Sequence, residues 1–434
     1  MSLWRMILTA VNLVGFRLGG AAMGLVSQIL LARLLPQEDV GVVLMSMSAA
    51  AIISLLMTAG YPSLTMTVVP RYIALGRTGL ERGFRNALWH DTIWASLALA
   101  AICTAAYLWA PVSDGMRQAL LFGALMSPAS SLIRITSSFA NSRRLFNLSY
   151  VPDFLFRPGM LFVFLLAMLL LRESPGLGTV LWVVVGSTWA VAIGQAIAVG
   201  RGIFPEALAR GRRSLAPFFR GRAAAMVLIA AVVMAFADIV TLIGGAFLPA
   251  HDVAQLGIAI RLAALAGFVT QVTQNFVLPD LSEALVAGQR RSVRKIILRS
   301  NLITMSAIGA CVLVVLVAGP LILAIFGPDY QGARWPLVLF MVSQLFRAAG
   351  GLNQHLLSLD GYQTRSVWAC VTSVMLLIAA SSLLAPRFGL EGVAVAVLLA
   401  EACWAMVLGL QAQRYAGYRG DIFANFRFHS EPAE

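Results

Sequence analysis

The chain has 434 residues, of which 59% are hydrophobic and only 12% are charged, and its mean hydropathy is +0.84. A soluble domain of this length needs more charged groups to cover its surface, so the composition excludes a soluble protein. The formal net charge of +13 comes almost entirely from arginine, because Lys295 is the only lysine. These basic residues gather between apolar runs, which argues against nucleic acid as a partner.

The apolar runs are unbroken and near or above the length of about 20 residues that a helix needs to cross a bilayer. They cover roughly 8–33, 40–69, 87–110, 117–139, 149–171, 178–200, 223–247, 253–283, 299–326, 334–357, 366–385 and 390–412. We therefore predict an all-α integral membrane protein with about twelve transmembrane helices. The longer runs predict tilted or broken helices.

The loops between these runs differ in charge. With the N-terminus in the cytoplasm, about 22 basic residues lie on the cytoplasmic side and about 5 on the opposite side, as the positive-inside rule requires. We therefore predict a multi-pass protein of the bacterial inner membrane with both termini in the cytoplasm.

Two stretches about two hundred residues apart, 26–76 and 239–288, share one design. In each, a leucine–proline pair leads into an acidic turn and an apolar segment that ends at a glycine. The matching residues are Pro36 and Pro249, Asp39 and Asp252, and Gly76 and Gly288. A diverged repeat of hydrophobic hairpins predicts two pseudo-symmetric six-helix bundles around a central cavity.

The repeat and the loop composition divide the chain into four parts. We predict an N-terminal six-helix bundle over 1–200, a basic cytoplasmic linker over 201–222, a C-terminal six-helix bundle over 223–412 and a cytoplasmic tail over 413–434. The arginines of the linker are interpreted first as a topology determinant and second as a site for anionic lipid headgroups. The tail is expected to be partly disordered.

Charged residues also lie inside the apolar runs, where each costs about 2.5–3.5 kcal/mol and needs a partner or a water-filled cavity. They are Arg17, Arg134, Arg157, Arg261 and Arg347, accompanied by Asp91, Asp153, Asp238 and Glu401. The i,i+4 spacing of Asp153 and Arg157 predicts a local pair. Asp238 and Arg261 fall at similar depth on adjacent helices, which predicts an ion pair that either fixes the hairpin or serves transport.

Arg17 and Arg347 have no partner nearby in the sequence, so we expect them to line the cavity, together with Arg134, Arg157 and Arg261. Arginine there suits an anionic substrate, because its guanidinium makes paired hydrogen bonds to phosphate. The amides Gln274, Asn275 and Gln344 are candidates to bind substrate hydroxyl groups, with hydrogen bonding between helices as the alternative. Glu401 is a candidate for cation or proton coupling.

The sequence contains no motif for nucleotide binding, metal binding or nucleophilic catalysis. There is no phosphate-binding loop with its glycine–lysine pattern, no metal-ligand cluster among the histidines and no Ser/His/Asp group on an aqueous face. We therefore predict a protein that is not an enzyme and that holds no cofactor and no metal.

Short segments spread over nearly the whole chain resemble one known family. They are Ala32–Gly41, Ala237–Val240, Ala259–Ala263, Val277–Pro279, Phe326–Tyr330 and Gly389–Ala394. In this order they resemble the Wzx-type polysaccharide flippases of the MOP superfamily, which also includes multidrug (MATE) exporters and the lipid II flippase. Ala254, where the family usually has glycine, is a departure.

The resemblance implies translocation of undecaprenyl-diphosphate-linked oligosaccharide units, by alternating access, for O-antigen, capsule or exopolysaccharide synthesis. It also implies membrane lipids, and a polymerase and a chain-length regulator of the same pathway, as partners. Two alternatives stay open. One is a multidrug or cation antiporter of the same superfamily, which should favour acidic and aromatic residues in its cavity. The other is a scaffold that transports nothing.

Overall fold

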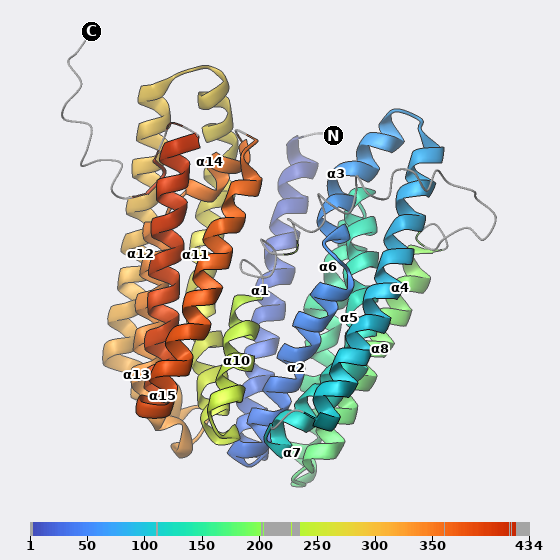
Figure 1. Cartoon of the computed structure of the whole chain (residues 1–434), viewed down its shortest axis with the longest axis vertical. Helices are drawn as coiled ribbons and strands as arrows, with labels where there is room; N and C mark the ends of the chain where they lie inside the picture. Colours follow the sequence, from blue (N-terminus) through green and yellow to red (C-terminus); the bar gives the residue numbers. More distant parts are fainter. Residues whose placement is uncertain are drawn as a thin grey trace. The chain divides into compact units, whose positions relative to one another are not determined.

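The computed structural model describes residues 3–109, 112–200, 203, 227, 235–359, 361–415, 417 and 419–421; for residues 3–14, 17, 18, 275, 290 and 363 it describes the backbone alone. These parts of the chain are helices joined by short connections and contain no strand (Figure 1), which confirms the predicted all-α class. Nine of the described helical segments are long and apolar enough to cross a membrane. The chain is therefore a multi-pass membrane protein.

The chain divides into two compact units, Met1–Ala246 and Phe247–Glu434. The helices of the first unit are α1 (Leu3–Leu34), α2 (Gln37–Met57), α3 (Tyr61–Ala74), α4 (Thr78–Trp109), α5 (Asp114–Ser142), α6 (Phe146–Val151), α7 (Arg157–Leu171), α8 (Leu177–Val199) and α10 (Phe236–Phe247). A π-helical turn, Pro152–Phe156, joins α6 to α7. The fifth predicted span is thus one helix with a distorted turn.

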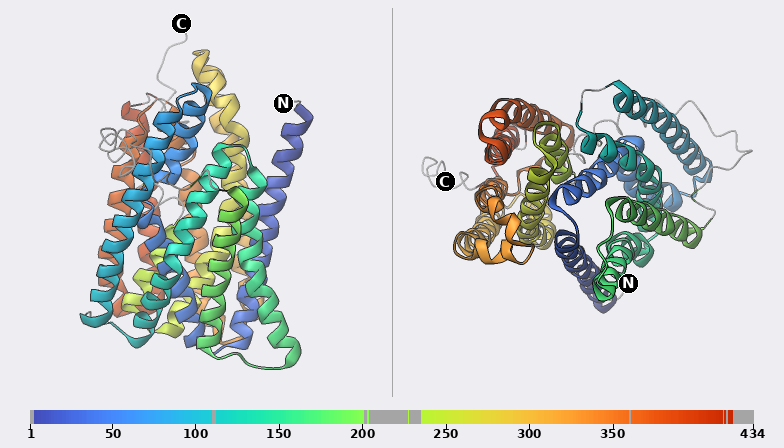
Figure 2. Two further views of the ribbon diagram at one scale, coloured as in Figure 1. Left: turned by 90° about the vertical axis from the view of Figure 1, so that its right-hand side faces the viewer. Right: turned by 90° about the horizontal axis from the view of Figure 1, so that it is seen from below.

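Helix α5 packs directly against α2 (Figure 2). Gly123 makes this close approach possible, because a Cβ there would lie 2.5 Å from the Cβ of Ala49 and 3.1 Å from the carbonyl oxygen of Ser46. Small residues allow helix backbones to approach in this way inside membranes. The α2–α5 contact sets the position of the polar side chains described below.

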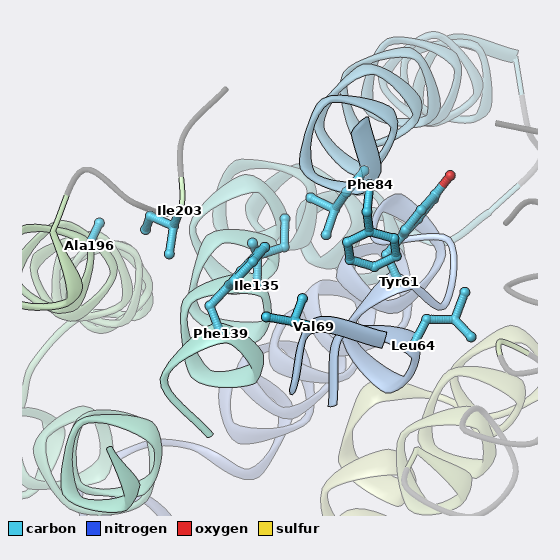
Figure 3. Close-up of a cluster of buried hydrophobic side chains, with 9 residues drawn as sticks. Tyr61, Leu64, Val69, Phe84, Ile135, Phe139, Ala196 and Ile203 are labelled. Carbon is cyan, nitrogen blue, oxygen red and sulfur yellow. The ribbon is translucent and has the colours of Figure 1, made fainter. Parts of the chain in front are cut away.

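The second predicted span is broken. Helix α2 ends at Met57 and α3 begins at Tyr61, with Ala59 (φ 46°) and Gly60 (φ 76°) between them in left-handed conformations. Beyond the break, Tyr61 packs on Phe84 of α4, with ring centroids 5.7 Å apart, in a cluster of nine buried residues (Figure 3). The break expected from the length of this run is therefore present, and an aromatic contact fixes its far side.

Helix α10 belongs to the first unit, although the sequence placed 223–247 in the second half. Gly245 explains its packing, because a Cβ there would overlap Met45 of α2 and lie 2.8 Å from Met116 of α5. This packing explains why the first unit extends to Ala246, and the predicted division into two six-helix bundles stays a prediction. The predicted linker, 201–222, lies outside the described residues except for Ile203, whose carbonyl accepts a hydrogen bond of 2.6 Å from Trp89 Nε1.

The second unit contains α11 (Ala250–Val286), α12 (Arg290–Ala324), a 3₁₀ segment η4 (Pro328–Ala333), α13 (Arg334–Ala349), α14 (Asn353–Leu359), a 3₁₀ turn η5 (Gln363–Arg365) and α15 (Ser366–Tyr415). Helix α15 is interrupted at Gly389 (φ 56°, ψ −132°). Its two parts correspond to the eleventh and twelfth predicted spans. The tenth span is also broken, between α13 and α14.

The two copies of the predicted repeat share their end geometry. Pro36 precedes α2 with φ −56° and ψ 147°, and Pro249 precedes α11 with φ −66° and ψ 157°. Gly76 and Gly288 end the copies with φ of 63° and 66°. After each glycine, the next backbone N–H donates to the carbonyl five residues back, at 2.9 and 3.0 Å. These ends therefore close in the same way, a helix-stop motif that favours glycine.

Candidate functional site

Arg134 of α5 reaches across to α2. Its Nε donates to Ser54 Oγ at 3.1 Å and its Nη2 to the carbonyl oxygen of Ala51 at 3.5 Å. Among the described residues, no carboxylate forms a salt bridge with this guanidinium within 4.0 Å. Arg134 is thus a largely buried cation whose direct partners are neutral oxygen atoms.

The position of Arg134 follows from the α2–α5 contact. Ser127, Ser130 and Ser131 are buried on the same part of α5, and Ser131 Oγ donates to the carbonyl oxygen of Ser54 at 3.3 Å. Because these residues are small, the two helices approach closely and the long side chain of Arg134 meets α2 directly.

Three further charges act on Arg134 through space, and they come from other helices of the first unit. These are Asp153, Arg157 and Asp238. We call these four residues the Arg134 cluster. It contains two arginines and two carboxylates, so the charges balance within it.

Two contacts hold the other members of the Arg134 cluster. Asp153 lies within the π-helical turn and Arg157 directly follows it; the two residues, whose spacing predicted a local pair, are 3.4 Å apart. Asp238 Oδ1 accepts a hydrogen bond of 2.9 Å from Ser48 Oγ of α2. Helix α2 therefore supplies a hydroxyl to one cation of the cluster and a second hydroxyl to one anion.

Arg347, for which the sequence offers no nearby partner, is paired with Glu401. Arg347 Nη2 lies 3.0 Å from Glu401 Oε1, and its Nε donates to Oε2 at 3.1 Å. The Glu401 side chain is 2% exposed and that of Arg347 is 23% exposed. The guanidinium also lies over the ring of Trp404, 5.3 Å from its centroid. This pair gives one of the predicted intramembrane arginines a carboxylate partner.

Two of the predicted amides of the second unit, Gln274 and Gln344, lie against protein groups. Gln274 Nε2 donates to the carbonyl oxygen of Gly351 at 3.1 Å, and its Oε1 lies 3.3 Å from His355 Nε2. Gln344 packs against Gly267, where a Cβ would lie 3.1 Å from Gln344 Oε1. Gln274 therefore makes hydrogen bonds within the protein, which was the alternative to binding substrate hydroxyl groups.

The structure leaves other predicted residues untested. The side chains of Arg17 and Asn275 lie outside the described residues. The predicted pair of Asp238 and Arg261 joins residues of different units, and it stays a prediction. Within the described residues, no group of three or more His, Cys, Asp or Glu side chains is placed to hold a metal.

Sequence reasoning missed several residues of these sites. Ser48, Ser54 and Trp404 are ordinary residues for an apolar helix, and nothing in their spacing distinguishes them from packing residues. Glu401 was identified as a buried acid, but its partner lies 54 positions away on another helix. Only the packing of α13 on α15 brings the two together.

Comparison by sequence finds nothing: no family model matches this chain, and no curated protein matches it. Comparison of structures finds clear likeness. An inward-facing multidrug resistance MATE family transporter of the MOP superfamily matches with a TM-score of 0.72 and 12% identity, over 92% of this chain and 94% of that one. The lipid II flippase MurJ, in an inward closed conformation, matches with a TM-score of 0.72 and 12% identity, over 93% and 87%.

A third structural neighbour is a MOP superfamily transporter from Pyrococcus furiosus, described as having a binding pocket of reversed polarity. It matches with a TM-score of 0.55 and 11% identity, over 93% of this chain and 95% of that one. At these identities the likeness establishes the fold. The chain is thus a multi-pass helical membrane protein with the fold of MOP superfamily transporters.

Proposed function

We propose that this protein moves a lipid-linked, phosphate-bearing oligosaccharide from the cytoplasmic to the outer leaflet of the bacterial inner membrane. The specific substrate class is an undecaprenyl-diphosphate-linked unit for O-antigen, capsule or exopolysaccharide synthesis, carried by alternating access with both termini in the cytoplasm. The shared fold supports membrane transport, because its structural neighbours include the lipid II flippase MurJ. A polymerase and a chain-length regulator are the partners that this function implies.

The observation that carries the proposal is the bonding of Arg134. Its guanidinium donates to a serine hydroxyl and a backbone carbonyl, both neutral. Hydrogen bonds between a guanidinium and a phosphate are roughly twice as strong as those to neutral acceptors. A diphosphate would therefore displace Ser54 with a gain in free energy, whereas an arginine already held by a carboxylate would gain much less.

The rest of the Arg134 cluster explains how such a cation is tolerated while no substrate is bound. Asp153 pairs directly with Arg157, and both Asp153 and Asp238 act on Arg134 from a distance. An isolated cation in the membrane is costly, and nearby acids lower that cost. When a diphosphate binds, its negative charge adds to the cluster at Arg134, where no carboxylate is in contact.

Multidrug export is the second candidate, because Glu401 beside Trp404 is the combination of carboxylate and aromatic ring that recognises organic cations. Arg347 already occupies both groups, at 3.0 Å from the carboxylate and 5.3 Å from the ring centroid. An organic cation would have to displace an internal ion pair. This places drug export second.

The test is transport in proteoliposomes. A fluorescent undecaprenyl-diphosphate-linked oligosaccharide is incorporated, and its movement is followed with a membrane-impermeant quencher. Removal of a hydrogen bond to a charged group costs about 1.5–3 kcal/mol, so Arg134→Gln is expected to lower the initial rate at least tenfold. Arg134→Lys keeps the charge, so its initial transport rate should lie between those of Arg134→Gln and the unaltered protein.

Arg387→Gln is the matched control, because Arg387 is exposed and lies outside every predicted site. It should transport at the rate of the unaltered protein. A second set of vesicles, loaded with ethidium, tests drug export. Movement of ethidium without movement of the lipid-linked sugar would replace the proposed function by drug export. Movement of neither compound would favour the scaffold that transports nothing.

A further inference from the structure

The segment that follows α15 is docked within the second unit. The carbonyl oxygen of Gly420 accepts hydrogen bonds from the Leu352 N–H and from Asn301 Nδ2, each at 3.1 Å. The N–H of Gly420 donates to Asn353 Oδ1 at 2.7 Å. The sequence predicts a partly disordered tail from residue 413, and within this tail the described residues Arg419–Asp421 are docked.

The docking point is the break between α13 and α14. Gly351 adopts φ 56°, and a Cβ at this residue would overlap the carbonyl oxygen of Gly420. Both the left-handed backbone and the close approach of Gly420 therefore require glycine at this position. The carbonyl of Gly351 is bound in turn by Gln274 of α11. Backbone groups freed by a broken membrane helix need partners, and here α11 and the tail supply them.

The tail also packs on α15. Arg419 and Asp421 pair with each other at 2.7 Å, with side chains 19% and 5% exposed. Gly409 of α15 lies beneath this pair, since a Cβ there would be 2.6 Å from Asp421 Oδ2. Gly350, which directly follows α13, approaches Ala405 of α15, because a Cβ added at Gly350 would lie 3.3 Å from that of Ala405. The tail therefore bridges the ends of two helices that already touch.

We propose that Arg419–Gly420–Asp421 is a latch that holds the end of α13 against α15 and thereby positions Arg347 against Glu401. Arg347 lies one helical turn before Gly350, and Glu401 lies one turn before Ala405, so the ion pair and the latch share one helix–helix contact. The inference rests on the proposed function only where Arg347 is taken as a substrate-binding residue. The latch itself is tested without substrate.

The first test is hydrogen exchange of the full chain and two shortened chains. Deletion of residues 416–434 removes the latch, and exchange of the Leu352 amide and its neighbours should become at least tenfold faster. Deletion of 422–434 alone is the matched control and should leave that exchange unchanged. Equal exchange in all three proteins would overturn the latch.

Two variants of the full chain guard against misfolding of the shortened one. Gly420→Leu introduces a Cβ at 2.9 Å from the Asn353 nitrogen and from the Leu352 carbonyl carbon, so it should undock the tail. Asn301→Ala removes a single hydrogen bond and should raise the exchange rate about threefold. Slow exchange in both variants would show that the tail does not protect the break.

The second test reports on Arg347. Cys370 is buried beside Trp404 and Arg347. In a protein whose other three cysteines are serine, labelling of Cys370 by N-ethylmaleimide should become at least fivefold faster when residues 416–434 are deleted. If Cys370 labelling is unchanged while exchange of the Leu352 amide is faster, the tail protects the helix break but does not position Arg347. Neither measurement needs transport, so failure of the proposed function and failure of the latch are distinguishable.

Discussion

Arg347 of α13 and Glu401 of α15 meet through two nitrogen–oxygen contacts, at 3.0 and 3.1 Å, and the guanidinium lies over the Trp404 ring. The carboxylate is almost completely buried, whereas the guanidinium keeps 23% of its surface exposed. The two partners therefore depend on each other unequally. Removal of Arg347 leaves a charge enclosed by protein, whereas removal of Glu401 leaves a charge that is partly exposed.

This inequality predicts the order of stability among variants. Removal of one partner of a buried ion pair costs about 3–5 kcal/mol, because the remaining charge is left uncompensated. Arg347→Leu should lower the thermal midpoint in detergent more than Glu401→Leu does, because it leaves the more buried charge. The double variant should regain most of the loss, since replacement of a buried pair by apolar residues is often nearly neutral.

Arg387→Leu serves as the control, because this exposed arginine has none of these contacts. The thermal midpoints of the two single variants, the double variant and the control are measured by differential scanning fluorimetry and compared with that of the unaltered protein. A double variant as unstable as the sum of the single variants would show that the two side chains act independently.

The fold could be predicted from the sequence to a large extent, because hydropathy and the distribution of arginine report directly on what lies in the membrane. The repeat ends at Pro36, Gly76, Pro249 and Gly288 were also visible, because proline and glycine fix backbone geometry that the structure repeats. The break was also visible at Gly60 and Pro62, because glycine and proline interrupt helices. The contact of Tyr61 with Phe84 beyond the break has no local pattern in the sequence.

The sites were less predictable. The cost of charge inside a membrane singled out Arg134, Arg157, Asp238 and Glu401, and their part in transport stays a prediction. Their partners were found only where the spacing was local, as for Asp153 and Arg157. The pairing of Arg347 and the docking of Gly420 depend on helices far apart in sequence, and a glycine in a polar tail carries no signal that it will bind a helix break.

The hydrogen bond between Arg134 and the Ser54 hydroxyl leads to a further prediction. Under the proposed function this hydroxyl would compete with the substrate phosphate for the same guanidinium, so Ser54→Ala should leave the arginine easier to engage. We expect the substrate concentration for half-maximal transport to fall about threefold, because a neutral hydrogen bond contributes about 0.5–1.5 kcal/mol. Arg134→Gln should shift it in the opposite direction.

Ser46→Ala is the matched control, since Ser46 lies on the same helix but donates only to its own backbone, at Val42, with a distance of 2.8 Å. It should leave the half-maximal concentration unchanged. An equal shift in both serine variants would show that α2 packing, rather than release of Arg134, sets the apparent affinity.

The contact between α2 and α5 gives a prediction that does not depend on function. Gly123→Ala places a Cβ 2.5 Å from that of Ala49, so the helices must separate. Overpacking of this kind costs about 1–3 kcal/mol and should lower the thermal midpoint. Gly186→Ala, in α8, meets no atom within 4 Å and should leave stability equal or slightly higher. Equal midpoints would show that the helices are not in tight contact at Gly123.

The repeat predicts matched effects at two glycines. Gly76 and Gly288 end their helices with φ of 63° and 66°, and an added Cβ meets no atom within 4 Å at either. The cost of alanine there is therefore backbone strain alone, about 1–2 kcal/mol in each case. Gly76→Ala and Gly288→Ala should lower the thermal midpoint by similar amounts, whereas Gly79→Ala, in helical conformation and also in open space, should not lower it. A large effect at one copy and none at the other would mean that the two ends, although alike in geometry, do not contribute equally to folding.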